Sequence, residues 1–353
     1  YQLPYLTGVA INGGAWALVW FGHWTYANRL ARDDGWRGTE ERTSRTRLVA
    51  FLVVIISAAA MTLGRVATAI GAALDPVLPD PPYFEPDPAY LPDLASAILT
   101  PLLTAIPWAI VWFAHTRALR REPAAGNALR ALHQERLVSH GVAATALAIG
   151  ATGAGWLLGY LFDLALGGQR ATGPNASTYE LGTWLPATVV GLGAWWWFWR
   201  SVLARRRSEP VDEANSTIRR SFLFLTLGVA LVAAIAASAL ILYRLVDTML
   251  GAGIGGALAS ELSTPLGALI AAGAVLAYHG LALKADQRLA KADEAEAVDT
   301  GGAVAPAGSE PVATRGDIGR RPFALVGPSA ELDAALAAAR AALPAGVEIA
   351  EEA

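Results

Sequence analysis

Residues 221–246 read SFLFLTLGVALVAAIAASALILYRLV, a stretch in which Arg244 is the single charged side chain. About 20 apolar residues in an α-helix are enough to cross the hydrocarbon core of a bilayer. A helix is favoured there because it satisfies the backbone hydrogen bonds within the segment itself. The stretch therefore predicts a transmembrane helix.

Six more stretches of this kind occur along the 353 residues. The composition agrees, because 54% of the residues are hydrophobic and 16% are charged, against about 25% charged residues in soluble domains. A membrane β-barrel is excluded, since it would show segments of about ten residues in which apolar and polar side chains alternate. The sequence predicts an all-α polytopic transmembrane helix bundle with seven spans, at about residues 5–24, 48–74, 94–115, 137–166, 181–203, 221–246 and 262–283.

Arginines are unevenly shared among the loops between these spans. Residues 25–47 hold six arginines, residues 116–136 hold five and residues 200–220 hold six, whereas the intervening loops hold Arg170 alone. Loops rich in Lys and Arg stay in the cytoplasm during insertion. The asymmetry predicts that the N-terminus of this sequence lies outside and its C-terminal tail lies in the cytoplasm.

The spans also resemble one another. Residues 16–23 read WALVWFGH and residues 108–115 read WAIVWFAH, so the ends of the first and third spans superpose. The fifth span carries WFWR at residues 197–200, with Arg200 in place of the histidine, and the seventh ends at His279. The even spans each begin at an arginine and reach an aspartate, from Arg47 to Asp75, from Arg136 to Asp163 and from Arg219 to Asp247.

Tandem similarity of this kind indicates a repeated structural unit, here a helical hairpin, and predicts that a further helix before Tyr1 completes four hairpins. The Trp-Phe-x-His helix ends and the loop EERTSRTR at residues 40–47 resemble the bacterial membrane family catalogued as domain of unknown function 5671, over about residues 1–290. Later units depart from the loop pattern, with QER at residues 134–136 and STIR at residues 216–219. The resemblance implies a membrane-embedded helical fold in a bacterial inner membrane, and it supplies no catalytic residues.

Aromatic and histidine side chains gather where the odd spans meet the arginine-rich loops. Tryptophans there usually form an interfacial belt, but Trp16 and Trp108 lie one turn deeper, at a depth that suits aromatic walls around a lipid or an apolar cofactor. His23, His115 and His279 share one depth, which suits haem ligation or a pH-sensing cluster; the plainer interpretation is interfacial histidines satisfied by water or lipid phosphate. The candidate ligand-binding residues are Trp16, Trp20, His23, Trp108, Trp112, His115, Trp197 and His279.

Other features argue against catalysis. The chain has no cysteine, which excludes thiolate catalysis and cysteine metal sites, and no nucleophile, base and oxyanion set can be assembled from the spans. We therefore predict no catalytic residues, no metal and no cofactor. The run GAGIGG at residues 251–256 does not follow a strand and is not a nucleotide site. Gly155-x-x-x-Gly159 predicts close helix packing, and the three repeated aspartates predict polar helix ends or, as the alternative, a cation-binding ring.

Three segments follow from these patterns. Residues 1–284 form the transmembrane domain, residues 285–321 a linker that is charged and then rich in Gly, Ala and Pro, and residues 322–353 a small β-α-β-like cytoplasmic segment. The last segment is too short to bury a stable core alone. We expect it to dock on another surface.

The sequence predicts a non-enzymatic membrane protein that scaffolds a partner or binds lipid. The alternative is a transporter or channel with a pathway between repeats, which duplication favours and a membrane midplane without ionisable side chains disfavours. A haem-binding electron carrier is the third hypothesis. The expected partners are the lipid bilayer and a second copy or another membrane protein, and nucleic acid is not among them.

Overall fold

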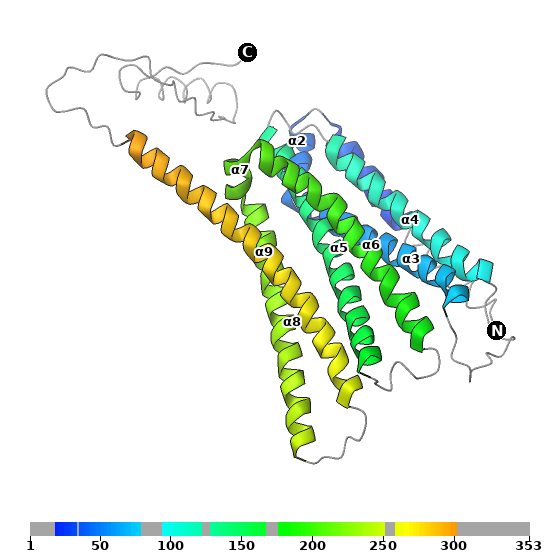
Figure 1. Cartoon of the computed structure of the whole chain (residues 1–353). Helices are drawn as coiled ribbons and strands as arrows, with labels where there is room; N and C mark the ends of the chain where they lie inside the picture. The colour runs from blue at the N-terminus through cyan, green and yellow to red at the C-terminus, as the bar shows by residue number, and fades with distance from the viewer. Residues whose placement is uncertain are drawn as a thin grey trace, which may run out of the picture. The chain divides into compact units, whose positions relative to one another are not determined.

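The computed structural model describes residues 18–33, 35–78, 94–121, 128–166, 176–250 and 258–301. The described residues are almost entirely helical and contain no strand, which confirms the all-α class. Residues 18–31 are helical, and the helices that follow (Figure 1) are α2 (Trp36–Thr43), α3 (Arg45–Leu74), the short 3-10 helix η1 (Asp75–Val77), α4 (Leu94–Arg121), α5 (Ala128–Ala165), α6 (Ala176–Ser208), α7 (Pro210–Asn215), α8 (Thr217–Met249) and α9 (Leu258–Gly301).

Five helical segments among the described residues are long and apolar enough to cross a membrane, namely α3 with η1, α4, most of α5, α8 and most of α9. The described residues therefore support five of the seven predicted spans. α6, predicted as the span 181–203, is not among the five. The first predicted span, at 5–24, is described only from residue 18 onward.

The chain divides into two compact units, Tyr1–Val298 and Asp299–Ala353. α9 continues to Gly301, so the beginning of the segment predicted as a linker from residue 285 is helical. The β-α-β-like tail predicted at residues 322–353 lies outside the described residues.

Short helices precede α3 and α8 in the same way. α2 ends at Thr43, and the hydroxyl of Ser44 then accepts a hydrogen bond from the backbone N–H of Arg47 at 3.3 Å. α7 ends at Asn215, and Ser216 takes the N-cap position of α8. The Ser44 side chain satisfies one of the free N–H groups of the first turn, which is why serine is favoured at this position, whereas the Ser216 side chain makes no such bond. The two loops thus share the order short helix, serine, long helix.

α5 is the central helix, in contact with α3, α4, α6 and α8. Its glycines let neighbouring backbones approach closely, since Gly150 lies against Gly191 of α6, and Gly155 and Gly159 lie against α9. A Cβ on Gly159 would lie 2.9 Å from the Cα of Thr264, which is closer than real side chains come. Small residues permit such close contacts between helices. In lipid these contacts matter because no hydrophobic effect drives the helices together. The predicted packing at Gly155-x-x-x-Gly159 is confirmed.

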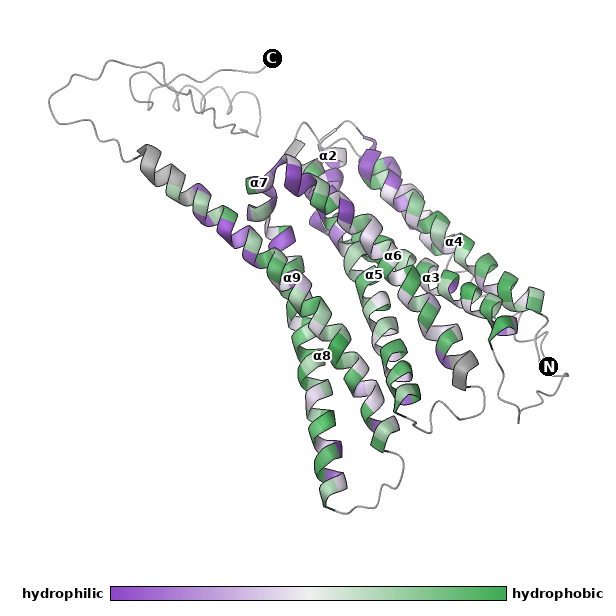
Figure 2. Cartoon of the chain, viewed as in Figure 1, coloured by the Kyte–Doolittle hydropathy of each residue, from purple (hydrophilic) through white to green (hydrophobic). Residues whose placement is uncertain are grey.

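The outer surface of the long helices is apolar. α8 exposes large hydrophobic side chains such as Leu225, Val232 and Leu242. Figure 2 shows hydrophobic residues along most of the long helices and hydrophilic ones gathered toward one end. A contiguous apolar surface of this size is a liability in water but suits the hydrocarbon of a bilayer. We call the hydrophilic end, where α4 and α6 finish in arginines and α3, α5 and α8 begin, the basic end.

Candidate functional site

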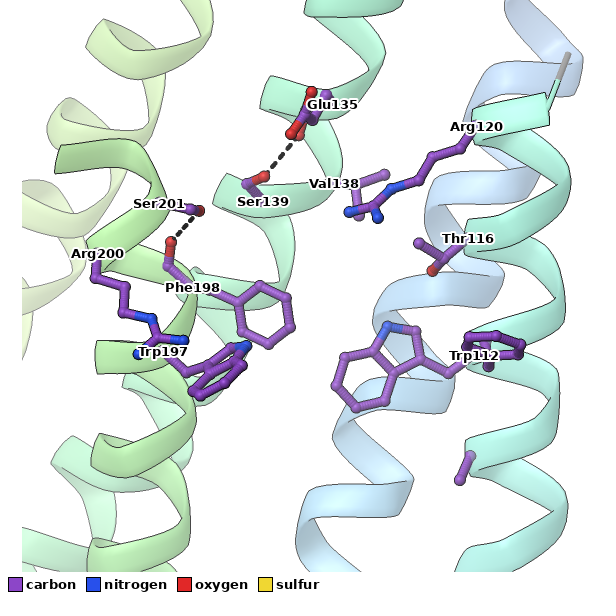
Figure 3. Close-up of a pocket in the computed structure, with 12 residues that line it drawn as sticks. Trp112, Thr116, Arg120, Glu135, Val138, Ser139, Trp197, Phe198, Arg200 and Ser201 are labelled. Atoms are coloured by element: carbon purple, nitrogen blue, oxygen red, sulfur yellow. Dashed lines mark hydrogen bonds between the residues drawn. The ribbon is translucent and has the colours of Figure 1, made fainter. Parts of the chain in front are cut away.

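A pocket of about 430 Å³ lies at the basic end between α4, α5 and α6. Figure 3 shows its opposite walls on α4 and α6, with residues of α5 between them. The position follows from the fold, because α4 and α6 both pack against the central helices α3 and α5. The lining side chains that matter most for its chemistry are Trp112, Arg120, Glu135, Trp197, Phe198 and Arg200.

The walls of the pocket are aromatic. Trp112 reaches in from α4, while Trp197 and Phe198 line the α6 side (Figure 3). The ring centroids of Trp112 and Phe198 are 5.9 Å apart, within the range of favourable aromatic pairs. Trp197 keeps 60% of its surface exposed. The pocket therefore offers broad apolar ring faces. Other side chains of the described residues do not cover them.

Charged and polar groups complete the lining. Arg120 and Arg200 are both exposed, and the Arg200 guanidinium carbon lies 3.5 Å from the centre of the Trp197 ring, where a cation–π attraction holds it. Glu135 is half-exposed. The hydroxyl oxygen of Thr116 is buried and has no hydrogen-bond partner among the described residues. With two guanidiniums, one carboxylate and a free hydroxyl, the lining suits a ligand with an apolar body and an anionic head.

His115, one of the predicted ligand-binding residues, is enclosed by aromatic rings instead of lining the pocket. Its ring centroid lies 4.2 Å from that of Trp24 and 5.3 Å from that of Trp20, and the Phe51 ring closes a third side. The side chain is 2% exposed, and its Nδ1 lies 2.7 Å from the carbonyl oxygen of Val111, one turn earlier. Trp20 and His115, both candidate ligand-binding residues, thus lie together within a packed core.

His279 sits in a second aromatic enclosure, made by α6, α8 and α9. Trp195, Trp199 and Phe222 lie around its ring with centroids 5.7 to 6.0 Å away, and the side chain is 1% exposed. Trp199 donates its Nε1–H to the hydroxyl of Tyr278 at 2.7 Å. His115 and His279 thus have different aromatic neighbours on different helices.

The remaining predicted site residues are spread over the bundle. His23 is exposed and Trp108 is 38% exposed, while Trp16 lies outside the described residues. The structure brings Trp112 and Trp197 together in one pocket, and Trp20 together with His115. The repeated aspartates also differ, because Asp163 is fully buried whereas Asp75 is exposed and Asp247 only partly buried.

Sequence reasoning missed the buried ion pairs of the basic end. Arg136 donates to Glu213 at 2.8 Å, and both side chains are buried. Arg219 donates to Asp286 at 2.6 Å. The repeated arginines could be seen in the sequence. Their carboxylate partners could not be identified, because Arg136 and Glu213 are 77 residues apart in the chain. Arg47, at the equivalent place in α3, pairs with the nearby Glu41 at 3.2 Å.

Comparison with protein families supports the resemblance seen in the sequence. Residues 136–274 match the family model described as Domain of unknown function (DUF5671). The matched region runs from near the start of α5 into α9 and includes the α6 wall of the pocket and the Arg136–Glu213 pair. Comparisons with curated proteins and with solved structures gave no match. The family description assigns no activity, so a function has to be argued from the site.

Proposed function

We propose that this chain is a non-enzymatic integral membrane protein that binds an acidic phospholipid in the pocket between α4 and α6. The observation that carries the proposal is the combination of aromatic walls, Trp112 and Trp197, with two exposed guanidiniums, Arg120 and Arg200, in one pocket. Apolar walls with a few placed polar groups are typical of ligand sites. Guanidinium groups bind phosphate through charge-assisted hydrogen bonds.

The position of the pocket supports a lipid over a water-soluble ligand. The pocket lies at the basic end, while the helices that run away from it are apolar on their outer faces. An acyl chain can therefore lie along the helices while the headgroup stays among the arginines. Anionic lipids attract basic groups near the cytoplasmic surface by about 1 kcal/mol per Lys or Arg. We accordingly place the basic end at the cytoplasmic face of a bacterial inner membrane.

Repetition of the helical hairpin explains why the pocket occurs at this place. In the sequence repeat, Arg200 superposes on His115 and His279, both of which are buried among aromatic rings. A guanidinium is far costlier to bury than an imidazole. Arg200 therefore stays exposed and stacks on Trp197, and the space between α4 and α6 is left for a ligand.

Native mass spectrometry of the protein extracted in a mild detergent tests this proposal. We expect the wild-type protein to retain phosphatidylglycerol and not phosphatidylcholine. The double variant Arg120→Gln/Arg200→Gln should bind phosphatidylglycerol at least about tenfold more weakly, because each charge-assisted hydrogen bond contributes roughly 1.5–3 kcal/mol. Arg207→Gln is the control for the loss of one positive charge, since it neutralises an exposed side chain of the α6 arginine run.

Two results would contradict the proposal. Equal retention of phosphatidylglycerol and phosphatidylcholine would show that the arginines do not select the headgroup. Equal lipid binding by the wild type and the double variant would place the lipid elsewhere. A bound mass equal to haem, with a Soret band, would instead favour the electron-carrier hypothesis, and substrate-dependent flux in proteoliposomes would favour a transporter.

A further inference from the structure

A second group of arginines at the basic end is largely buried. It contains more guanidinium groups than buried carboxylates to pair with them. Arg136 donates from Nε to Glu213 at 2.8 Å. Arg219 and Arg206 both donate to Asp286, at 2.6 and 2.7 Å. The side chains of Glu213 and Asp286 are 0% and 2% exposed. Two buried carboxylates therefore serve three guanidiniums from α5, α6 and α8.

Arg205 adds a fourth guanidinium to this group. Its side chain is 15% exposed, and its ion-pair partner is the half-exposed Glu135, 3.5 Å from Nη1. Among the described residues, hydrogen-bond partners are lacking for Nε and Nη2 of Arg205, Nη2 of Arg136 and Nη1 of Arg219, all of them buried atoms. Buried donors left unpaired are strongly unfavourable, most of all on charged groups. One buried carboxylate oxygen of the same group, Oε1 of Glu213, also has no partner among the described residues. Four unpaired donors against this one acceptor oxygen favour a further acceptor.

His140 and Trp199 show that these groups converge. The positive charges of Arg136, Arg205 and Arg219 all act on His140, whose side chain is 3% exposed. The Arg219 guanidinium carbon lies 5.4 Å from the centre of the Trp199 ring, and the His140 ring stands edge-on to that same ring at 6.2 Å. Nδ1 of His140 lies 2.7 Å from the carbonyl oxygen of Arg136, while its Nε2 has no partner within the described chain.

We propose that the guanidiniums of Arg136, Arg205 and Arg219 bind a phosphate-type oxyanion beside His140. A tetrahedral oxyanion presents several acceptor oxygens, which match donors that arrive from three helices, and arginine is well suited to such recognition. Its negative charge also balances the guanidinium excess. None of these four residues lines the α4–α6 pocket, whose lining includes Glu135, the ion-pair partner of Arg205. The oxyanion site is therefore a separate site that adjoins the proposed lipid site through this ion pair.

Thermal stability in detergent tests the oxyanion site. Purified, delipidated protein in a phosphate-free buffer is titrated with inorganic phosphate, and sodium chloride of equal ionic strength serves as the salt control. We expect phosphate to raise the melting temperature of the wild type. Arg205→Gln should shift the phosphate response to roughly ten- to a hundredfold higher concentration, because it removes charge-assisted hydrogen bonds. Arg207→Gln, which lies outside both proposed sites, should respond like the wild type.

A second arm separates the two sources of phosphate. The same proteins are mixed with vesicles of phosphatidylcholine alone or with added phosphatidic acid. Stabilisation by phosphatidic acid that depends on Arg205, without a response to inorganic phosphate, would identify the ligand as a lipid headgroup and support the site. A phosphate or phosphatidic acid response that is unchanged in Arg205→Gln, or no response to either ligand, would overturn it. If Arg120→Gln/Arg200→Gln still binds phosphatidylglycerol like the wild type, the lipid-site proposal fails. The result for the oxyanion site is unaffected by that outcome.

Discussion

Glu213→Gln should lower the free energy of unfolding by about 3–5 kcal/mol, because it leaves the buried guanidinium of Arg136 without a counter-charge. The Arg136 side chain is 6% exposed and that of Glu213 is fully buried. The pair also fastens the short helix α7 to α5. The change in unfolding free energy is measured in phosphate-free buffer. SDS is titrated into the protein in a mild detergent, and the loss of helicity is recorded.

Two further variants separate this effect from a general loss of charge. Glu135→Gln removes a carboxylate that is 50% exposed and 3.5 Å from its arginine, so it should cost no more than about 1 kcal/mol. The double variant Arg136→Met/Glu213→Gln should recover most of the lost stability, since it removes the uncompensated charge. Equal effects of Glu213→Gln and Glu135→Gln would show that the Arg136–Glu213 pair is not the cause.

Gly267→Leu should destabilise the packing of α5 against α9 by roughly 1–3 kcal/mol or more, the usual cost of overpacking. A Cβ at Gly267 would meet the backbone of Gly155 and Gly159 on α5, including the Gly159 Cα at 2.9 Å. Backbone atoms cannot rotate away as a side chain can, so the two helices must separate. SDS titration of the variant is expected to show unfolding at a lower detergent fraction.

Gly273 on the same helix is the control for this prediction. A Cβ there would have no neighbouring atom within 4 Å, so Gly273→Leu should leave stability unchanged or raise it slightly through the better helix propensity of leucine. If Gly267→Leu and Gly273→Leu behave alike, α5 and α9 do not pack as closely as the structure has them.

Hydrophobic runs predicted the positions of the long helices well. The stretch 221–246 lies within α8, Thr217–Met249, and the predicted span 137–166 nearly coincides with the second part of α5. α6 is the instructive exception, because it was predicted as a span and is not among the helices apolar enough to cross a membrane. Its helix is nevertheless as long as α8, at 33 residues, and packs along α5.

The candidate site was predictable only in part. Repeat superposition placed Trp112 and Trp197 at one depth, and the structure shows that both line one pocket. The same superposition placed three histidines at one depth, yet His115 and His279 are buried whereas His23 is exposed. Depth along a helix follows from sequence, but burial depends on which neighbouring helix covers that face.

Buried ion pairs were beyond sequence reasoning for a related reason. Glu41 and Glu213 both stand six residues before a repeated arginine, at Arg47 and Arg219. Glu41 pairs with its own Arg47, whereas Glu213 pairs with Arg136 of the preceding hairpin. The choice of partner is decided by helix packing, so identical spacing leads to different contacts.

Labelling of single cysteines tests most directly whether the apolar helices cross a membrane, and the chain is suited to it because it has no cysteine of its own. Ser208→Cys and Met249→Cys place one thiol at the basic end and one at the far end of α8, and Val232→Cys places one on an exposed apolar face between them. In intact membranes, a charged maleimide should label Ser208→Cys from one side of the membrane only and Met249→Cys from the other side only. Val232→Cys should react only after denaturation. Reaction of Val232→Cys as fast as Ser208→Cys in intact membranes would contradict the account, because the apolar face of α8 would then lie in water.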